Sequence, residues 1–248
     1  MKYILSGGGT GGHIYPALAI GEEIKKKDKR AQILYVGKKD SLEEELAKKY
    51  NFDFEGIDVS GLPRKKLNKD TVITFFNLMK GLNQCTKILD KFKPDIVIGT
   101  GGYVCGPIVF KAQQKKIKTV IQEQNAYPGK TNKILAKKAD FVFINFMEAK
   151  KYLDNENIIF TGNPVRDIFS HGDREESRKS LNINTKEKFV FSFGGSGGQE
   201  STNDAIIEIL NKNEKLPFRL THVTGREHYE YFMRKVEKVP ENVEILDY

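Results

Sequence analysis

Short apolar runs alternate along the chain with longer segments in which apolar residues recur at helical spacing. The runs are rich in β-branched and aromatic residues, which favour strands, and five occur early, at residues 3–5, 33–36, 95–98, 119–122 and 141–144. The helical segments between them span residues 16–27, 41–49, 71–89 and 129–138. Glu44 follows Ser41 at the spacing of a capping box. Alternating strands and helices predict an α/β fold built on a parallel sheet.

The alternation is interrupted at residues 161–169, where the segment TGNPVRDIF carries Gly162 and Pro164. The net charge changes sign at the same place, because it is +10 up to Asn163 and −2 from there to the end, within a total of +8. We therefore expect two domains, residues 1–163 and residues 164–248.

The second domain repeats the α/β pattern on a smaller scale. Strands are expected at residues 189–193, 218–223 and 243–246, with a helix at residues 201–210. The pattern ends on a strand that has no helix after it to cover it, so we expect the second domain to be incomplete.

Composition narrows the class of protein. The chain has 248 residues, 39% of them hydrophobic and 30% charged, which is typical of a globular protein. Cys85 and Cys105 are too few for a disulfide framework or a four-thiolate zinc site, and this favours a reducing, cytoplasmic compartment. No apolar run is long enough for a signal peptide core or for a membrane span of about 20 residues. We expect any membrane contact to be peripheral, and no cofactor or metal site.

Three glycine-rich turns each follow a predicted strand and precede a predicted helix. They read SGGGTGGH at residues 6–13, GTGGYVCGP at residues 99–107 and FGGSGGQ at residues 193–199. Glycines at such a place let main-chain amides approach an anion at the positive end of a helix. Ligands of open α/β sheets collect at the carboxyl ends of the strands, where these turns lie. The polar segment QEQNAYPGKTNK follows another strand and reaches the same edge.

The first turn also allows a different interpretation. Gly7, Gly9 and Gly12 satisfy the dinucleotide pattern GxGxxG. The second strand then runs into Lys38 and Lys39 instead of an acidic residue, which disfavours NAD and leaves an NADP-binding oxidoreductase as an alternative. A nucleic-acid partner is not expected, because the chain shows neither a known motif nor an aromatic stacking face.

The motifs HIYPALA, GTGGYVCGP, QEQNAYPGKTNK, TGNPVR and GGSGGQ, in this order, resemble the MurG family of peptidoglycan N-acetylglucosaminyltransferases. The resemblance implies a GT-B fold, with two Rossmann-like domains facing across a cleft. It also implies inverting transfer of N-acetylglucosamine from UDP-N-acetylglucosamine to lipid I, which gives lipid II, at the cytoplasmic face of the bacterial plasma membrane. The family continues beyond the residue that matches Tyr248, so a truncated, non-catalytic fragment that retains acceptor and membrane binding is a second alternative.

The resemblance also assigns site residues. Those matching the donor-binding positions are Thr10, Gly11, Gly12, Asn125, Arg166 and Ser196. Those matching positions for catalysis or for handling the acceptor are His13, Glu123, Tyr103, Asn132 and Asn203.

His13 is the expected general base, because imidazole titrates near neutral pH and this residue lies at the start of a helix beside the presumed ligand. The alternative is that His13 caps the turn or binds the acceptor pyrophosphate without moving a proton. The glycine-turn amides and Arg166 would stabilise the departing UDP.

The segment at residues 62–84 is expected to contact an anionic membrane surface. It mixes the basic residues Arg64, Lys65, Lys66, Lys69 and Lys80 with the apolar residues Val72, Ile73, Phe75, Phe76, Leu78, Met79 and Leu82. This composition suits a helix that lies at an interface, although any one of the apolar residues can instead face the core.

Overall fold

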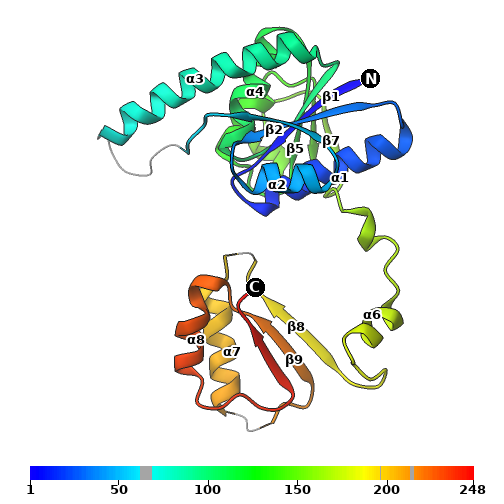
Figure 1. Ribbon diagram of the computed structural model, residues 1–248, viewed down its shortest axis with the longest axis vertical. Coiled ribbons are helices and arrows are strands. Elements are labelled where there is room, and N and C mark those ends of the chain that lie inside the picture. The colour runs from blue at the N-terminus through cyan, green and yellow to red at the C-terminus, as the bar shows by residue number, and fades with distance from the viewer. Residues whose placement is uncertain (62–68, 196, 213–214) are drawn as a thin grey trace. The chain divides into compact units, whose positions relative to one another are not determined.

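The computed structural model describes residues 1–61, 69–195, 197–212 and 215–248, and for residues 69–77 it describes the main chain only. The chain divides into two compact units, a first unit at Met1–His171 and a second unit at Gly172–Tyr248 (Figure 1). The division falls at His171, whereas the sequence places it at Asn163, so the segment TGNPVR belongs to the first unit.

The first unit is built on a sheet of seven parallel strands in the order β3-β2-β1-β4-β5-β6-β7. The strands are β1 (Lys2–Gly7), β2 (Gln32–Lys38), β3 (Asp53–Ile57), β4 (Ile96–Gly101), β5 (Lys118–Glu123), β6 (Phe141–Ile144) and β7 (Ile158–Phe160). The five expected strands are present. The two edge strands, β3 and β7, were not predicted. β3 carries Asp53 and Glu55 and has no continuous apolar run, and β7 is only three residues long.

Helices lie on both faces of this sheet (Figure 1). They are α1 (Gly11–Lys27), α2 (Leu42–Lys49), α3 (Lys69–Phe92), α4 (Gly102–Gln114) and α5 (Lys130–Ala136), with short 3-10 turns at η1 (Met147–Tyr152) and η2 (Asp167–Phe169). The expected capping box of α2 does not form. The Ser41 hydroxyl donates to the Lys38 carbonyl at 2.5 Å, and Glu44 accepts from the amide of Asp40 at 3.0 Å.

Side chains of neighbouring residues in the central strands point to opposite faces of the sheet, and each face has its own hydrophobic core. Ile4 and Val97 pack with Ile108 of α4 on one face, in a cluster that also contains Cys85 and Leu89 of α3. Leu5, Tyr35 and Ile98 pack with Leu18 of α1 on the other face. Both faces of the sheet are therefore buried, as a parallel sheet requires. This explains why β1, β2 and β4 are continuously apolar and were predicted correctly.

Both cysteines are buried in the first of these cores, and both are free thiols. Burial raises the pKa of each thiol to about 12. Neither Cys85 nor Cys105 is therefore a reactive nucleophile.

The second unit has three parallel strands in the order β10-β9-β8. Its elements are α6 (Arg174–Ser180), β8 (Phe189–Phe193), α7 (Glu200–Lys212), β9 (Arg219–Val223), η3 (Arg226–His228), α8 (Tyr229–Lys235) and β10 (Val243–Leu246). Leu210, Leu220 and Phe232 form the centre of its core. Helices α6 and α8 were not predicted. None of the residues of α6 is buried, so it shows no apolar periodicity, and it begins where Asp173 accepts from two amides.

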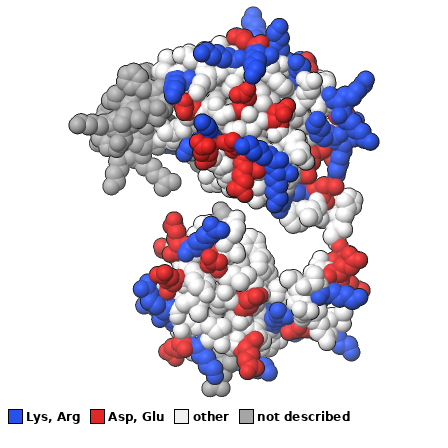
Figure 2. Space-filling model, viewed as in Figure 1, with Lys and Arg blue, Asp and Glu red and all other residues white. Residues whose placement is uncertain are grey.

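Lys and Arg gather on the first unit in the face that Figure 2 shows, in agreement with the charge difference along the chain. In the described part of the chain, none of the helices is both long and apolar enough to cross a membrane.

Candidate active site

The first glycine turn joins β1 to α1 and leaves the start of the helix open. Thr10 is the N-cap residue, yet its side chain makes no capping hydrogen bond, and the first turn of α1 contains no acidic residue. The amides of Gly11 and Gly12 begin the helix, where N–H groups have no acceptor within the helix. The positive end of α1 is therefore arranged to receive an anionic or polar ligand.

Two buried side chains form hydrogen bonds with the main chain of this turn. The carboxylate of Glu43, which is 4% exposed, accepts from the amide of Gly9 at 2.8 Å. The hydroxyl of Tyr35 donates to the carbonyl of Gly7 at 2.6 Å, and burial raises the pKa of Tyr35 well above its usual value. These contacts fix the main chain of the turn without occupying the amides at the start of α1.

The second glycine turn is clasped against the first. The amide of Gly8 donates to the carbonyl of Gly101 at 3.3 Å. Gly102 begins α4 with φ +77°, and a Cβ there would lie 2.0 Å from the carbonyl oxygen of Gly8. We call this contact of Gly8 with Gly101 and Gly102 the glycine clasp. Only glycine fits at position 102, because its φ and the close carbonyl both exclude a side chain.

His13 lies beside the glycine clasp and is held by the end of β4 and by the residue that follows β5. Its Nδ1 is 3.1 Å from the carbonyl oxygen of Thr100 and 2.9 Å from Oε1 of Gln124. The Thr100 hydroxyl donates to the main-chain carbonyl of His13 at 2.6 Å. The imidazole is half-buried, so it is both fixed in direction and open to a ligand.

Glu123 anchors the loop after β5. Its Oε1 accepts from the amide and the side-chain nitrogen of Asn125, both at 2.9 Å. Its Oε2 accepts from the amide of Gly129 at 3.2 Å and from Nδ2 of Asn132 at 2.9 Å. Glu123 is fully buried and Asn132 nearly so. This arrangement is that of a carboxylate which holds a loop in place and orients the side chain of Asn125.

Arg166 reaches the start of α1 through an aromatic contact. Its guanidinium lies 4.6 Å from the ring centre of Tyr15 and 4.8 Å from that of Phe169. The Tyr15 ring in turn covers Gly11, since a Cβ on that glycine would lie 3.2 Å from it. One guanidinium nitrogen also donates to the Tyr50 hydroxyl at 3.5 Å. Stacking on aromatic faces leaves the other N–H groups available for hydrogen bonds to a phosphate.

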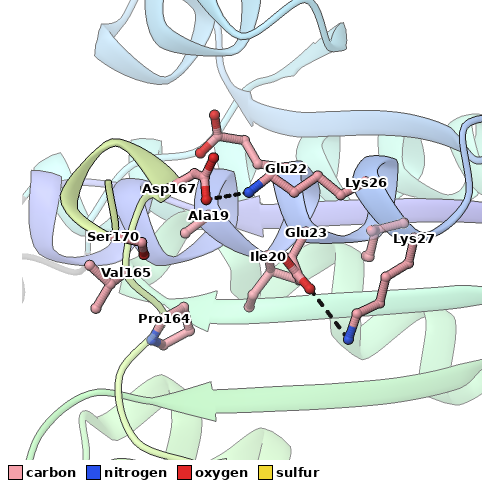
Figure 3. A pocket seen from close by; sticks show the side chains of 11 residues that line it. Ala19, Ile20, Glu22, Glu23, Lys26, Lys27, Pro164, Val165, Asp167 and Ser170 are labelled. Atoms are coloured by element: carbon pink, nitrogen blue, oxygen red, sulfur yellow. Dashed lines mark ion pairs between the residues drawn. The ribbon is translucent and has the colours of Figure 1, made fainter. Parts of the chain in front are cut away.

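A separate cavity of about 450 Å³ lies along the second half of α1, between Ala19 and Lys27, and is closed by residues 164–170 (Figure 3). Lys26 forms an ion pair with Asp167 at its rim. This cavity does not include the glycine turn or His13.

The second unit contains a similar contact between Gly198 and Thr224, which we call the second clasp. Gly198 has φ +75°, and a Cβ there would lie 2.1 Å from the carbonyl oxygen of Thr224, which follows β9. Asn203 of α7 donates to the same carbonyl at 3.1 Å, and its Oδ1 is 3.0 Å from Nε2 of His222. Burial lowers the pKa of His222, which keeps the ring neutral. Ser196, in the turn itself, lies outside the described residues.

The chain is similar in sequence to known glycosyltransferases. The N-terminal domain of glycosyltransferase family 28 matches residues 3–144. The UDP-N-acetylglucosamine--N-acetylmuramyl-(pentapeptide) pyrophosphoryl-undecaprenol N-acetylglucosamine transferase of Halalkalibacterium halodurans is 44% identical over 98% of this chain and 67% of its own length. The transferase of the same name from Acetivibrio thermocellus is 45% identical over 100% of this chain and 68% of its own length. This chain belongs to glycosyltransferase family 28.

Solved structures share the fold of this family 28 chain. The crystal structure of MurG from Acinetobacter baumannii has a TM-score of 0.70 at 24% identity and is matched over 68% of its length. The UDP-GlcNAc 2-epimerase of Neisseria meningitidis has a TM-score of 0.65 at 13% identity and is matched over 72% of its length. Both matches cover 100% of this chain. The expected GT-B fold class is confirmed.

The first unit brings most of the expected site residues to one edge of its sheet. The residues placed there are Thr10, Gly11, Gly12, His13, Tyr103, Glu123, Asn125, Asn132 and Arg166. Tyr103 covers the first turn, since a Cβ on Gly9 would lie 3.2 Å from its ring. Asn203 belongs to the second unit. Within the described residues there is no cluster of three or more side chains that could hold a metal ion.

Four residues that contact the site were not predicted. Glu43 lies outside the quoted motifs and contacts Gly9, which is 34 residues away. Thr100, Gln124 and Tyr15 lie inside the motifs GTGGYVCGP, QEQNAYPGKTNK and HIYPALA, but nothing in those motifs singles them out.

Replacing Gly102 with Ala tests the glycine clasp. The substitution forces a side chain into a left-handed conformation and against the Gly8 carbonyl, and we expect the free energy of unfolding of the first unit to fall by about 1–3 kcal/mol. Urea unfolding followed by circular dichroism measures this loss. Gly129→Ala is the matched control, because a Cβ there meets nothing within 4 Å. Equal stability of the two variants would contradict the clasp.

Proposed function

We propose that this chain transfers N-acetylglucosamine from UDP-N-acetylglucosamine to lipid I, the undecaprenyl-pyrophosphoryl-N-acetylmuramyl pentapeptide, and so makes lipid II for peptidoglycan synthesis. The observation that carries the proposal is the match to curated transferases of that name along practically the whole chain. The site supports it, because an open helix start, a stacked arginine and a half-buried histidine are what transfer from a nucleotide diphosphate sugar needs.

In this mechanism His13 is the general base. Its Nε2 takes the proton of the acceptor hydroxyl while the hydroxyl oxygen attacks the anomeric carbon of the donor. The bond from that carbon to the diphosphate oxygen breaks on the opposite side, the bonding electrons leave with UDP, and the configuration inverts. The amides of Gly11 and Gly12 and the guanidinium of Arg166 stabilise the negative charge that develops on the diphosphate.

The other residues bind or position. Thr10, Asn125 and Ser196 contact the donor, and Tyr103 contacts the acceptor. Glu123 acts by positioning, since its oxygens already accept four hydrogen bonds and Asn125 and Asn132 depend on it. In the second unit Asn203 supports the third glycine turn through the Thr224 carbonyl. The first unit then serves the acceptor and also contributes donor contacts, and the second unit serves the nucleotide sugar.

The NADP-binding alternative has less support. It uses the first glycine turn together with Lys38 and Lys39, and it gives no role to the second clasp or to the Glu123 loop. The membership in family 28 also favours a glycosyl donor.

A membrane surface is the third partner that we propose, because the acceptor is a lipid. An apolar cavity of about 320 Å³ opens between α3, α4 and α5. Its lining includes Leu78, Phe110 and Ile134, which are large apolar side chains exposed to solvent. The basic cluster Arg64, Lys65 and Lys66 of the expected membrane segment lies outside the described residues, as do the side chains of Lys69, Val72, Ile73, Phe75 and Phe76. The contact would be peripheral, at the cytoplasmic face.

Replacing His13 with Ala tests the mechanism. We expect kcat for transfer of labelled N-acetylglucosamine to a lipid I analogue to fall about 10²–10⁴-fold, which is the usual contribution of a general base. Binding of UDP-N-acetylglucosamine, measured by calorimetry, should persist. His171→Ala is the control, because His171 is 76% exposed. An unchanged kcat would remove His13 from the chemistry, and an inactive unsubstituted chain would contradict the proposed function.

The apolar cavity gives a matched test of membrane binding. We expect the chain to sediment with vesicles that contain anionic phospholipid at low salt, and less so at about 1 M salt, where charges are screened within about 3 Å. Ile134→Ser, at a 68% exposed residue of the cavity, should weaken the binding. Ile168→Ser, at a 71% exposed residue outside this cavity, should not. Equal binding by both variants would exclude the cavity from the contact.

A further inference from the structure

We propose that Gln124 is a positioning residue that fixes the proton of the neutral His13 imidazole on Nδ1 and leaves Nε2 free. The importance of this for catalysis rests on the proposed function, in which Nε2 takes the acceptor proton. The position of the proton itself can be measured without any turnover.

The direction of the Gln124 amide is set by oxygen atoms around it. Its Nε2 lies 2.7 Å from the carbonyl oxygen of Thr100 and 3.1 Å from that of Gln122. It also lies 2.5 Å from Oε1 of the Gln122 side chain. Carbonyl oxygens only accept hydrogen bonds, so the NH₂ group of Gln124 must face them. Turning the amide round would bring its own oxygen against two main-chain carbonyls.

The opposite end of the amide then faces His13. Oε1 of Gln124 is 2.9 Å from Nδ1 of the imidazole, and the Thr100 carbonyl oxygen is 3.1 Å from the same nitrogen. Both neighbours are acceptors, so Nδ1 must carry a proton in order to bond to either. In a neutral ring the lone pair is consequently on Nε2. Within the described residues, no hydrogen-bond partner occupies Nε2.

Gln122 completes the arrangement. It is 1% exposed, and its side-chain oxygen accepts from Gln124, while its own Nε2 has no hydrogen-bond partner among the described residues. A buried amide that leaves a donor unpaired is unusual in a protein interior. The orientation that leaves this donor unpaired is the one that supplies an acceptor to Gln124. Hydrogen bonds are thus donated in one direction, from His13 to Gln124 and from Gln124 to Gln122.

The group beside Nδ1 of His13 is a neutral amide, not a carboxylate. A carboxylate beside Nδ1 would favour the charged imidazolium, whereas a neutral amide accepts the Nδ1 proton without adding charge. Between the two neutral tautomers of His13, Gln124 therefore selects the one with a free Nε2, which is the form required of a base. Glu123, the carboxylate next to it in sequence, is turned away and bound by Asn125, Gly129 and Asn132.

The test is nitrogen NMR of the four histidines in the full chain, with His13→Ala used to assign the His13 signals. In the unsubstituted protein we expect Nδ1 of His13 to show the chemical shift of a protonated nitrogen and Nε2 that of an unprotonated one. Gln124→Met keeps a similar volume and removes the amide, so the proton should move wholly or partly to Nε2. Gln113→Met is the control, because Gln113 donates to the Leu135 carbonyl at 2.8 Å without contacting His13.

A proton on Nε2 of His13 in the unsubstituted protein would overturn the proposal, whatever the variants do. So would a folded Gln124→Met protein in which the proton stays on Nδ1. If the chain transfers N-acetylglucosamine, Gln124→Met should lower kcat by at least about tenfold, a smaller loss than the roughly 10²–10⁴-fold expected on removing the general base itself, with little change in the KM for the donor. A correct proton position in a chain without turnover would contradict the proposed function and leave this inference standing.

Discussion

The contact of a glycine main chain with the carbonyl of a neighbouring turn is the constraint on which this site depends. In the first unit Gly102 lies against Gly8, and in the second unit Gly198 lies against Thr224. Each contact joins the loops that follow two adjacent parallel strands. A side chain at either glycine would separate the two loops, and in the first unit it would also displace the carbonyl of Thr100 and the imidazole of His13 from each other. The clasp therefore sets both the shape of the sheet edge and the direction of its histidine.

Two buried carboxylates of the first unit hold its main chain in place. Glu43 and Glu123 are both buried, and both accept from amides of the loops that carry the site. With these carboxylates occupied, His13 is the group that we propose for proton transfer. The open start of α1 and the stacked Arg166 are left to meet an anion. This division of roles matches a reaction in which a diphosphate leaves as a hydroxyl loses its proton.

Much of the fold could be predicted from the sequence, because the central strands are buried on both faces and are therefore continuously apolar. Edge strand β3 was not predicted, because an edge strand tolerates charged residues. Helix α6 was not predicted, because an exposed helix shows no apolar stripe. The glycine turns predict a site at the carboxyl ends of the strands. The partners of those turns could not be predicted, because Gln124 and His13 are separated by 111 residues, and only the folded sheet brings them together.

The central claim is that the ligand binds at the carboxyl ends of the strands, against the glycine clasps. The most direct test is to follow the backbone amide signals of the labelled chain by NMR during a titration with UDP-N-acetylglucosamine. The largest changes are predicted at residues 8–13, 101–103 and 125–129 and at residues 197–200. Largest changes at the opposite ends of the strands, near Lys2 and Lys118, would contradict the account.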